Sequence, residues 1–192
     1  MSDLRGEALA TLTEWLPAND EPERPQIQVA TVDGEGRPDL RTVLLSEWDE
    51  RGFVFHTDAR SRKSVQLASR PDVAVLVLWP GFTRQLVIRG RAEPLDPERV
   101  SYGYAKRSPY LKQLAWQNDH DLAQHERDER VAAWTAFRES RQPDALPAPP
   151  SWTGYLVRPD RLTFWRSDAE GPSHRIEYRA EGTDWVVEHL AG

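Results

Sequence analysis

The spacing of apolar residues near the N-terminus predicts an amphipathic helix. Leu4, Ala8, Leu12 and Trp15 recur at intervals of three or four residues, which places them on one face of a helix. Pro17 lacks the amide hydrogen that a further turn would need. We therefore expect a helix over about residues 3–16 whose apolar side covers part of a core.

Most of the remaining chain follows a strand pattern, with short apolar or alternating runs between turn residues. The segments 33–36 and 49–52 carry the glycines that tight hairpin turns use. Helices are predicted at 62–69, from Asp96 onward and over about 121–140, and a proline-rich loop is predicted at about 142–150. The predicted strands are 26–33, 39–46, 53–57, 72–79, 84–93, 152–158, 161–166, 175–179 and 184–190.

These elements define the expected fold class. A strand-rich chain with helices between its strands is typical of the α+β class, here an antiparallel barrel with peripheral helices. With 192 residues, the chain is long enough for a substantial core. We expect a single domain over residues 1–192 without internal repeats.

Composition narrows the range of partners. The net charge of −6 disfavours nucleic acid, because duplex binding depends on an extended basic face. No apolar run is long enough to cross a membrane and the first residues lack a signal-peptide pattern, so we expect a cytoplasmic location and no membrane partner. The absence of cysteine excludes thiolate metal sites. His120 and His125 fit a solvated helix face better than a metal site, and no metal is expected.

A cationic cluster, Arg60-Ser61-Arg62-Lys63, lies at the junction of the predicted strand 53–57 and the predicted helix 62–69. Guanidinium groups, an ammonium group and the free amides of a helix start all suit a phosphate monoester. Basic residues after a strand also occur as ordinary solvated surface. The cluster is therefore a candidate phosphate site whose interpretation depends on the rest of the chain.

Several motifs, in one order over nearly the whole chain, resemble the pyridoxamine 5′-phosphate oxidase family. They are Ala30-Thr31-Val32-Asp33, the strand from Arg41 to Leu45, Val54-Phe55-His56-Thr57, Ser61-Arg62-Lys63, Arg84-Gln85, Ala115-Trp116, Phe164-Trp165 and the end from Trp185 to Ala191. Members of this family are flavoproteins that bind FMN at a dimer interface. The resemblance implies an FMN-binding split barrel and a homodimer.

The resemblance also implies roles for individual positions. Arg62 and Lys63 match the phosphate-binding pair, and Gln85 matches a glutamine that reaches the flavin from the second subunit. His120 and Asp121 stand where the family usually has a Gln-Ser pair. The complete set of implied FMN-binding positions is Arg41, Thr42, Val43, Leu44, Ser46, His56, Thr57, Arg62, Lys63, Gln85, His120, Asp121, Trp165 and Arg175.

The substrate positions depart from the family pattern. Ser46 stands in place of a family lysine that helps to bind the substrate phosphate. A count without gaps places Gly103 on a family tyrosine and Leu111 on a family serine, whereas Arg107 matches the phosphate arginine. Only one of the four phosphate ligands is therefore retained.

The C-terminal signature departs as well. Without gaps, Gly171-Pro172-Ser173-His174-Arg175 keeps only the flavin arginine, whereas a shifted register over 175–179 would keep both arginines of the family signature. We prefer the register without gaps, because the shifted one needs an insertion and a shortened hairpin. The expected substrate contacts are Ser46, Arg107 and Ser173.

The resemblance implies an FMN-dependent oxidoreductase similar to pyridoxamine or pyridoxine 5′-phosphate oxidase, with two-electron transfer from a small substrate to FMN and dioxygen as acceptor. The flavin carries the chemistry in such enzymes, so no catalytic residue is assigned. Each lost phosphate contact is worth about 1.5–3 kcal/mol, which predicts weak binding of vitamin B6 phosphates. Two alternatives stay open: a relative that acts on another ring compound, of phenazine type, and a non-catalytic protein that binds flavin or a B6 phosphate.

Overall fold

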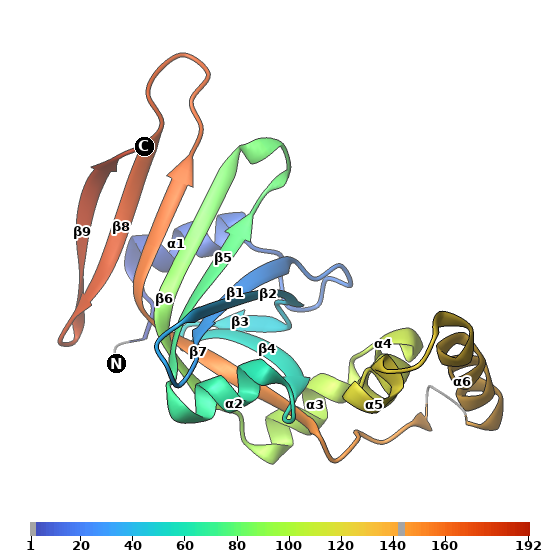
Figure 1. Ribbon diagram of the computed structural model, residues 1–192. Coiled ribbons are helices and arrows are strands. Elements are labelled where there is room, and N and C mark those ends of the chain that lie inside the picture. Colours follow the sequence, from blue (N-terminus) through green and yellow to red (C-terminus); the bar gives the residue numbers. More distant parts are fainter. Residues whose placement is uncertain (1–2, 142–144) are drawn as a thin grey trace.

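The computed structural model describes residues 3–141 and 145–192, which form one curled, antiparallel sheet with helices around it (Figure 1). The strands are β1 (Gln26–Val32), β2 (Pro38–Leu44), β3 (Glu47–Asp49), β4 (Gly52–Asp58), β5 (Asp72–Leu78), β6 (Arg84–Pro94), β7 (Trp152–Arg166), β8 (His174–Glu181) and β9 (Asp184–Ala191). Their order is β2-β1-β5-β6-β7-β4-β3, and β8 and β9 extend from β7. The expected fold, an α+β antiparallel split barrel, is confirmed.

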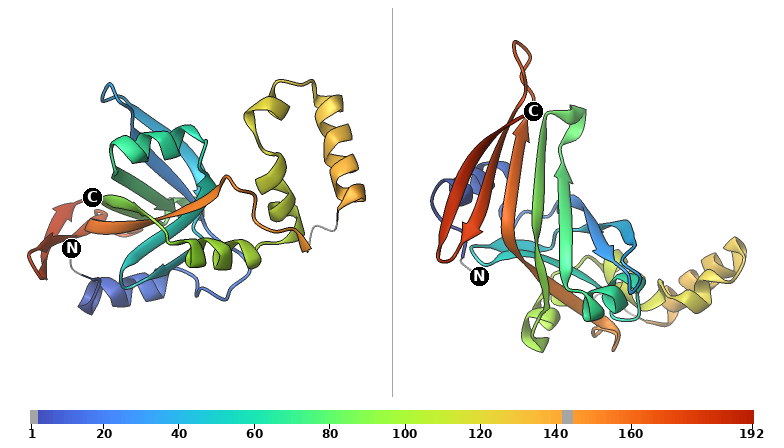
Figure 2. Two further views of the ribbon diagram at one scale, coloured as in Figure 1. Left: turned by 90° about the horizontal axis from the view of Figure 1, so that it is seen from below. Right: turned by 60° about the vertical axis from the view of Figure 1, so that its left-hand side comes forward.

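The helices lie at the periphery of the sheet, as expected. They are α1 (Gly6–Trp15), α2 (Arg62–Ser69), α3 (Pro97–Ala105), α4 (Pro109–Gln117), α5 (His120–Ala123) and α6 (Arg127–Ser140). Figure 2 shows α4 to α6 projecting from one side of the barrel, while β8 and β9 lie on the opposite side. No helix among the described residues is long and apolar enough to cross a membrane.

Helix α1 covers the core, which confirms the predicted N-terminal helix. Leu4, just before the helix, and Leu12 within it are buried. The Trp15 ring packs edge-on against Trp79 and Phe164, with ring centroids 5.3 and 5.2 Å apart. Aromatic pairs of this geometry add to the stabilisation that burial alone supplies.

The prediction of separate strands at 152–158 and 161–166 is wrong, because β7 runs through both. The register between β6 and β7 shifts between Arg89 and Gly90, opposite Pro159. Proline has no amide hydrogen for the ladder and is tolerated at such bulges. A Cβ atom on Gly90 would lie 1.9 Å from the Arg158 carbonyl oxygen, so the close approach of the two strands requires glycine.

The helical segment between β6 and β7 also differs from the prediction. Helix α4 was not predicted, although Ser108 caps it and Pro109 occupies its first turn. The single helix predicted over 121–140 is wrong, because α5 and α6 are separate, and Asp119 caps α5 by accepting from the Leu122 amide at 2.8 Å. Strand β3 was missed because three residues carry too short a pattern. Of the predicted loop, 142–144 lie outside the described residues, and 145–150 contain no strand.

Candidate functional site

The first cavity, of about 400 Å³, opens between β2, β4, α2 and α4. Its walls bring together seven of the positions singled out from the sequence, although segments distant in the chain supply them: β2, β4, the start of α2 and the turn between α3 and α4. These residues are Thr42, Val43, Leu44, His56, Thr57, Lys63 and Arg107. The cavity also reaches the junction of β4 and α2, where the sequence predicted a phosphate site.

Donor groups converge at this junction. Lys63 Nζ donates to Thr57 Oγ1 at 2.9 Å, and the Ser61 hydroxyl lies 3.4 Å from the same oxygen. Helix α2 begins at Arg62, as predicted, and its first turn carries no acidic residue that would repel an anion. Burial, and then the nearby Arg41 guanidinium, lower the pKa of Lys63. An anion bound at this point would favour the charged form of Lys63 and so offset both effects on its pKa.

Arg41 and Arg62 lie outside the first cavity, around Asp39. Arg41 donates to the Val29 carbonyl at 3.0 Å and forms an ion pair with Asp39 at 2.8 Å. The Arg62 side chain is 81% exposed and lies 3.6 Å from the same carboxylate. A hydrogen bond from Gln66, together with Arg41, lowers the pKa of Asp39. Of these three cations near the start of α2, therefore, Lys63 faces the first cavity, and the two arginines share a carboxylate.

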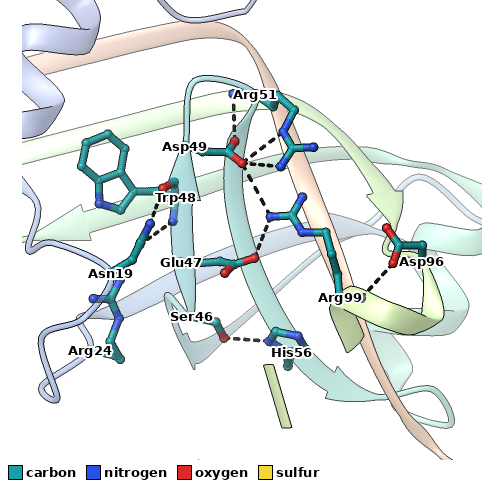
Figure 3. A network of polar contacts seen from close by, with 10 residues as sticks. All are labelled: Asn19, Arg24, Ser46, Glu47, Trp48, Asp49, Arg51, His56, Asp96 and Arg99. Atoms are coloured by element: carbon teal, nitrogen blue, oxygen red, sulfur yellow. Dashed lines mark hydrogen bonds and ion pairs between the residues drawn. The ribbon is translucent and has the colours of Figure 1, made fainter. Parts of the chain in front are cut away.

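His56 forms a wall of the first cavity with Trp152 and Arg107. The two rings stack at a centroid distance of 5.3 Å and an interplanar angle of 4°, and the Arg107 guanidinium lies 4.5 Å from the Trp152 ring centroid. His56 Nδ1 lies 2.9 Å from Ser46 Oγ (Figure 3). Burial lowers the pKa of Arg107 to about 10, and no carboxylate among the described residues pairs with it. Arg107 therefore stays a cation at neutral pH.

A second cavity, of about 600 Å³, lies on the other side of Arg107. Its lining includes Ser46, Gly103, Arg107 and Leu111, the four positions that the sequence analysis matched to the family's substrate-phosphate ligands. Arg107 and Leu111 line both cavities, so the two spaces are neighbours. Ser173, the remaining expected substrate contact, lies elsewhere, next to Gly192.

His120 and Asp121 line a third cavity, of about 580 Å³, together with Arg62. Both residues are exposed at the start of α5. This third cavity shares Asp58, Ser61 and Asn118 with the first, so the two cavities adjoin at the start of α2.

Gln85, Trp165 and Arg175 form a separate row at the far end of the sheet. Gln85 pairs with Trp165 across β6 and β7, and Trp165 pairs with Arg175 across β7 and β8. The exposed Phe82 ring lies against Trp165, with ring centroids 4.6 Å apart. Arg175 forms no ion pair, and Gln85 no side-chain hydrogen bond, with another residue in the described part of the chain. One chain thus holds two groups of expected flavin positions, far apart.

Sequence reasoning missed Trp152 and the pairing of His56 with Ser46. Trp152 was placed in a predicted strand without a role, because a strand pattern does not tell which side chain reaches a cavity. The Ser46 pairing links β4 with the residue before β3, a strand that was not predicted.

Two sequence profiles match the chain in succession. One, described as pyridoxamine 5′-phosphate oxidase, covers residues 18–144, and the other, described as the pyridoxine 5′-phosphate oxidase C-terminal dimerisation region, covers residues 152–192. The chain belongs to the pyridoxamine 5′-phosphate oxidase family. Curated relatives agree: a pyridoxine/pyridoxamine 5′-phosphate oxidase of Pseudomonas fluorescens is 35% identical over 96% of this chain and 88% of its own length. One of Ectopseudomonas mendocina is 37% identical over 95% of this chain and 83% of its own length.

Solved structures of related proteins share this split-barrel fold. The PhzG protein of Burkholderia lata, solved with tetrahydrophenazine-1-carboxylic acid, superimposes with a TM-score of 0.77 and 25% identity, and the match covers 96% of this chain and 88% of that one. An FMN-binding protein of Nostoc punctiforme, related to pyridoxamine 5′-phosphate oxidase, gives a TM-score of 0.70 at 22% identity over 88% of both chains. The second likeness supports the fold alone.

Proposed function

We propose that this protein binds FMN and acts as an FMN-dependent oxidoreductase similar to pyridoxamine 5′-phosphate oxidase, working as one domain in the cytoplasm. The observation that carries the proposal is the donor cluster of Lys63, Thr57 and Ser61 at the β4–α2 junction inside the first cavity. An ammonium group, two hydroxyls and a helix start are a set that suits a phosphate monoester.

The residues fit FMN in other respects. The first cavity has an apolar side, with Val43 and Leu44, and an aromatic side, with Trp152, as a flat ring system requires. Arg107 Nε is buried without a hydrogen-bond partner among the described residues, so the cavity holds polar groups that a ligand can satisfy. When bound, FMN supplies the two-electron chemistry, with dioxygen as the proposed acceptor, and the protein binds and orients the reactants.

The proposed active form is a homodimer with FMN at the interface. The first cavity adjoins the start of β7, whereas Trp165 lies near its end, and the intervening strand corresponds to roughly 40 Å. A single FMN cannot contact both groups of residues on one chain. A second copy, related by a two-fold axis, would bring its Gln85, Trp165 and Arg175 to the first cavity. The matching C-terminal dimerisation region supports this arrangement.

The second cavity is the proposed substrate site, with Ser46 and Arg107 as contacts, and its substrate is a small ring compound. Ser46, Gly103 and Leu111 supply no charge, so the affinity for a B6 phosphate is expected to be low. These positions favour a second candidate, a relative acting on a ring compound of phenazine type. The resemblance to PhzG is consistent with that candidate.

The decisive experiment is an absorption spectrum of the purified protein, followed by oxygen uptake with pyridoxamine and pyridoxine 5′-phosphates. A flavin spectrum with turnover of either compound would support the oxidase. A flavin spectrum without turnover of any tested amine or alcohol would favour the non-catalytic alternative. Protein that binds no FMN, even after incubation with excess cofactor, would contradict the proposed function.

A further inference from the structure

His56 occupies a tightly enclosed position in the wall next to both cavities. Its side chain lines the first cavity, and the Ser46 hydroxyl that it contacts lines the second. Only 7% of the residue is exposed, and the imidazole lies against the Trp152 ring. Figure 3 shows the imidazole of His56 on β4 pointing toward Ser46. The ring therefore links the two spaces.

Two glycines leave the room that the imidazole fills. A Cβ atom on Gly103 would lie 2.3 Å from His56 Cε1 and 2.4 Å from Nε2, and one on Gly154 would lie 2.7 Å from Cδ2. Gly103 lies inside helix α3, where glycine is normally unfavourable relative to alanine. The close approach of His56 explains why glycine stands there: the ring takes the place of a side chain at position 103.

Helix α3 cannot simply move away from the ring. Arg99, one turn before Gly103, forms ion pairs with Glu47 at 2.6 Å and with Asp49 at 3.7 Å (Figure 3). Asp96 also caps the helix by accepting from the Arg99 amide at 2.8 Å. These contacts tie α3 to strand β3 and set the distance between Gly103 and His56.

The imidazole is uncharged at neutral pH. Burial, followed by the positive charges of Arg107 and Arg99, lowers the pKa of His56 to about 4. The backbone of Arg99 partly offsets this shift, but Nε2 has no hydrogen-bond partner of good geometry among the described residues. Ser46 is therefore held by a neutral ring, and this part of the second cavity offers a hydroxyl instead of a cation.

We propose that His56 determines substrate specificity as a positioning residue, because its ring excludes a side chain at position 103 and fixes the Ser46 hydroxyl. The three residues act as one unit, which presents a neutral hydrogen-bonding surface. The favoured substrate is a ring compound that offers a neutral polar group to Ser46 and no phosphate. This inference rests on the proposed function, since it takes the second cavity as the substrate site.

A thermal-stability cycle tests the steric unit. Gly103→Ala should lower the melting temperature of the flavin-saturated protein, although alanine usually stabilises a helix interior. In the His56→Asn variant, the asparagine amide can keep a hydrogen bond to Ser46 but lacks the Cε1 and Nε2 atoms that lie next to Gly103. In that variant, Gly103→Ala should raise the melting temperature. Gly34→Ala is the matched control, because nothing lies within 4 Å of its added Cβ. An equal effect of Gly103→Ala in both backgrounds would overturn the proposal.

Ligand binding tests the specificity. Pyridoxal and pyridoxal 5′-phosphate share a ring and differ in the phosphate, and their dissociation constants can be measured through the flavin spectrum. The preference for the phosphate is the ratio of the dissociation constant of pyridoxal to that of pyridoxal 5′-phosphate. Ser46→Lys alone should raise this ratio less than about threefold, and Ser46→Lys with His56→Asn should raise it more than about tenfold. His56→Gln replaces His56→Asn if the latter does not fold.

Two binding results would contradict the inference: an equal rise in both backgrounds, or no binding of either probe to the flavin-saturated native protein. The flavin content of the same samples tests the proposed function separately. Native protein that binds no FMN would contradict that function, whereas the stability cycle would still decide whether His56 and Gly103 are coupled.

Discussion

The groups of side chains at the two ends of strand β7 differ: one forms an enclosed pocket within a single chain, and the other does not. At the first cavity, Thr57 and His56 are buried, and Lys63 already donates a hydrogen bond to Thr57. At the opposite end, Arg175 is exposed and Phe82 covers Trp165 with 59% of its own surface exposed. One end is a preformed pocket, and the other is a row of side chains on an open sheet.

In the proposed dimer, the pocket provides contacts that a single chain supplies, and the open row provides contacts that require a second copy. Polar groups in the pocket already have fixed positions, so changes there should weaken ligand binding directly. Groups in the open row gain their proposed role only when another chain lies against them. Each prediction below would break or sharpen that contrast.

The largest effect is expected at the pocket. Replacing Arg62 and Lys63 together with alanine should weaken FMN binding by roughly 100-fold or more, with Lys63→Ala accounting for most of the loss, because charge-assisted contacts are worth about 1.5–3 kcal/mol and exposed ones much less. Fluorescence titration with FMN measures the dissociation constants of the double variant and of Lys63→Ala.

Arg70→Ala is the matched control for this titration, because Arg70 is an exposed arginine at the other end of α2. It should leave the affinity unchanged. Unaltered FMN affinity in the double variant would remove the basis for placing the phosphate at this junction.

Mixed dimers test the proposed sharing of the site. Homodimers of Lys63→Ala and homodimers of Gln85→Ala should each bind FMN poorly. After unfolding and refolding together, random pairing gives half heterodimers, each with one intact site, so about a quarter of all sites should recover native affinity. Light scattering should show a dimer throughout. A stable monomer with FMN bound, or no recovery in the mixture, would contradict the shared site.

Acid should destabilise the pocket through His56. Its pKa is about 4 in the folded protein and near 6.5 when unfolded, so the unfolded chain binds the proton more readily between these values. Stability is therefore fully present above about pH 6.5 and is lost as the pH falls toward 4, by up to about 3 kcal/mol.

His56→Phe keeps an aromatic ring but cannot titrate, so its unfolding free energy should fall less between pH 7 and pH 4.5 than that of the native protein. Carboxylates such as Asp49 and Asp58, whose pKa values are also lowered by hydrogen bonds from arginines, affect both proteins and cancel in the difference. Parallel curves would show that His56 is not held neutral by burial.

Local sequence signals were sufficient for most of the fold. Apolar periodicity located α1, and the turn glycines separated β1 from β2. The start of α2 at Arg62 was also predicted correctly. These local signals failed at β3, where the strand pattern is short, and at the bulge opposite Pro159, where pairing with a distant strand determines the structure. A proline between two apolar runs suggests a turn, and only the pairing with Gly90 makes it a bulge inside one strand.

The residue types that line the candidate site were predictable from the sequence, but their geometry was not. Arg41, Arg62 and Lys63 look equivalent in the sequence, yet Asp39 holds the two arginines outside the first cavity. The presence of Gly103 was visible as a departure from the family pattern, but its cause, the His56 ring, lies on another element. A steric contact between residues that are distant in the chain, such as His56 and Gly103, produces no periodic pattern in a single sequence.

The smallest effect is expected from a change that the family pattern alone would favour. Ser46→Lys restores the family's lysine, yet it removes the hydroxyl that lies 2.9 Å from His56 Nδ1 and leaves the ring over Gly103. The native protein should oxidise pyridoxine 5′-phosphate slowly or not at all, and this substitution should raise kcat/KM less than about threefold, since one contact cannot rebuild a pocket in which neighbouring residues are coupled. Oxygen uptake with pyridoxine 5′-phosphate gives kcat/KM for the native protein and for Ser46→Lys. If the unmodified protein reached about 10⁴ M⁻¹s⁻¹, within the ordinary enzyme range, then Lys106 or Arg24, which line the second cavity beside Arg107, would have replaced the lost phosphate ligands.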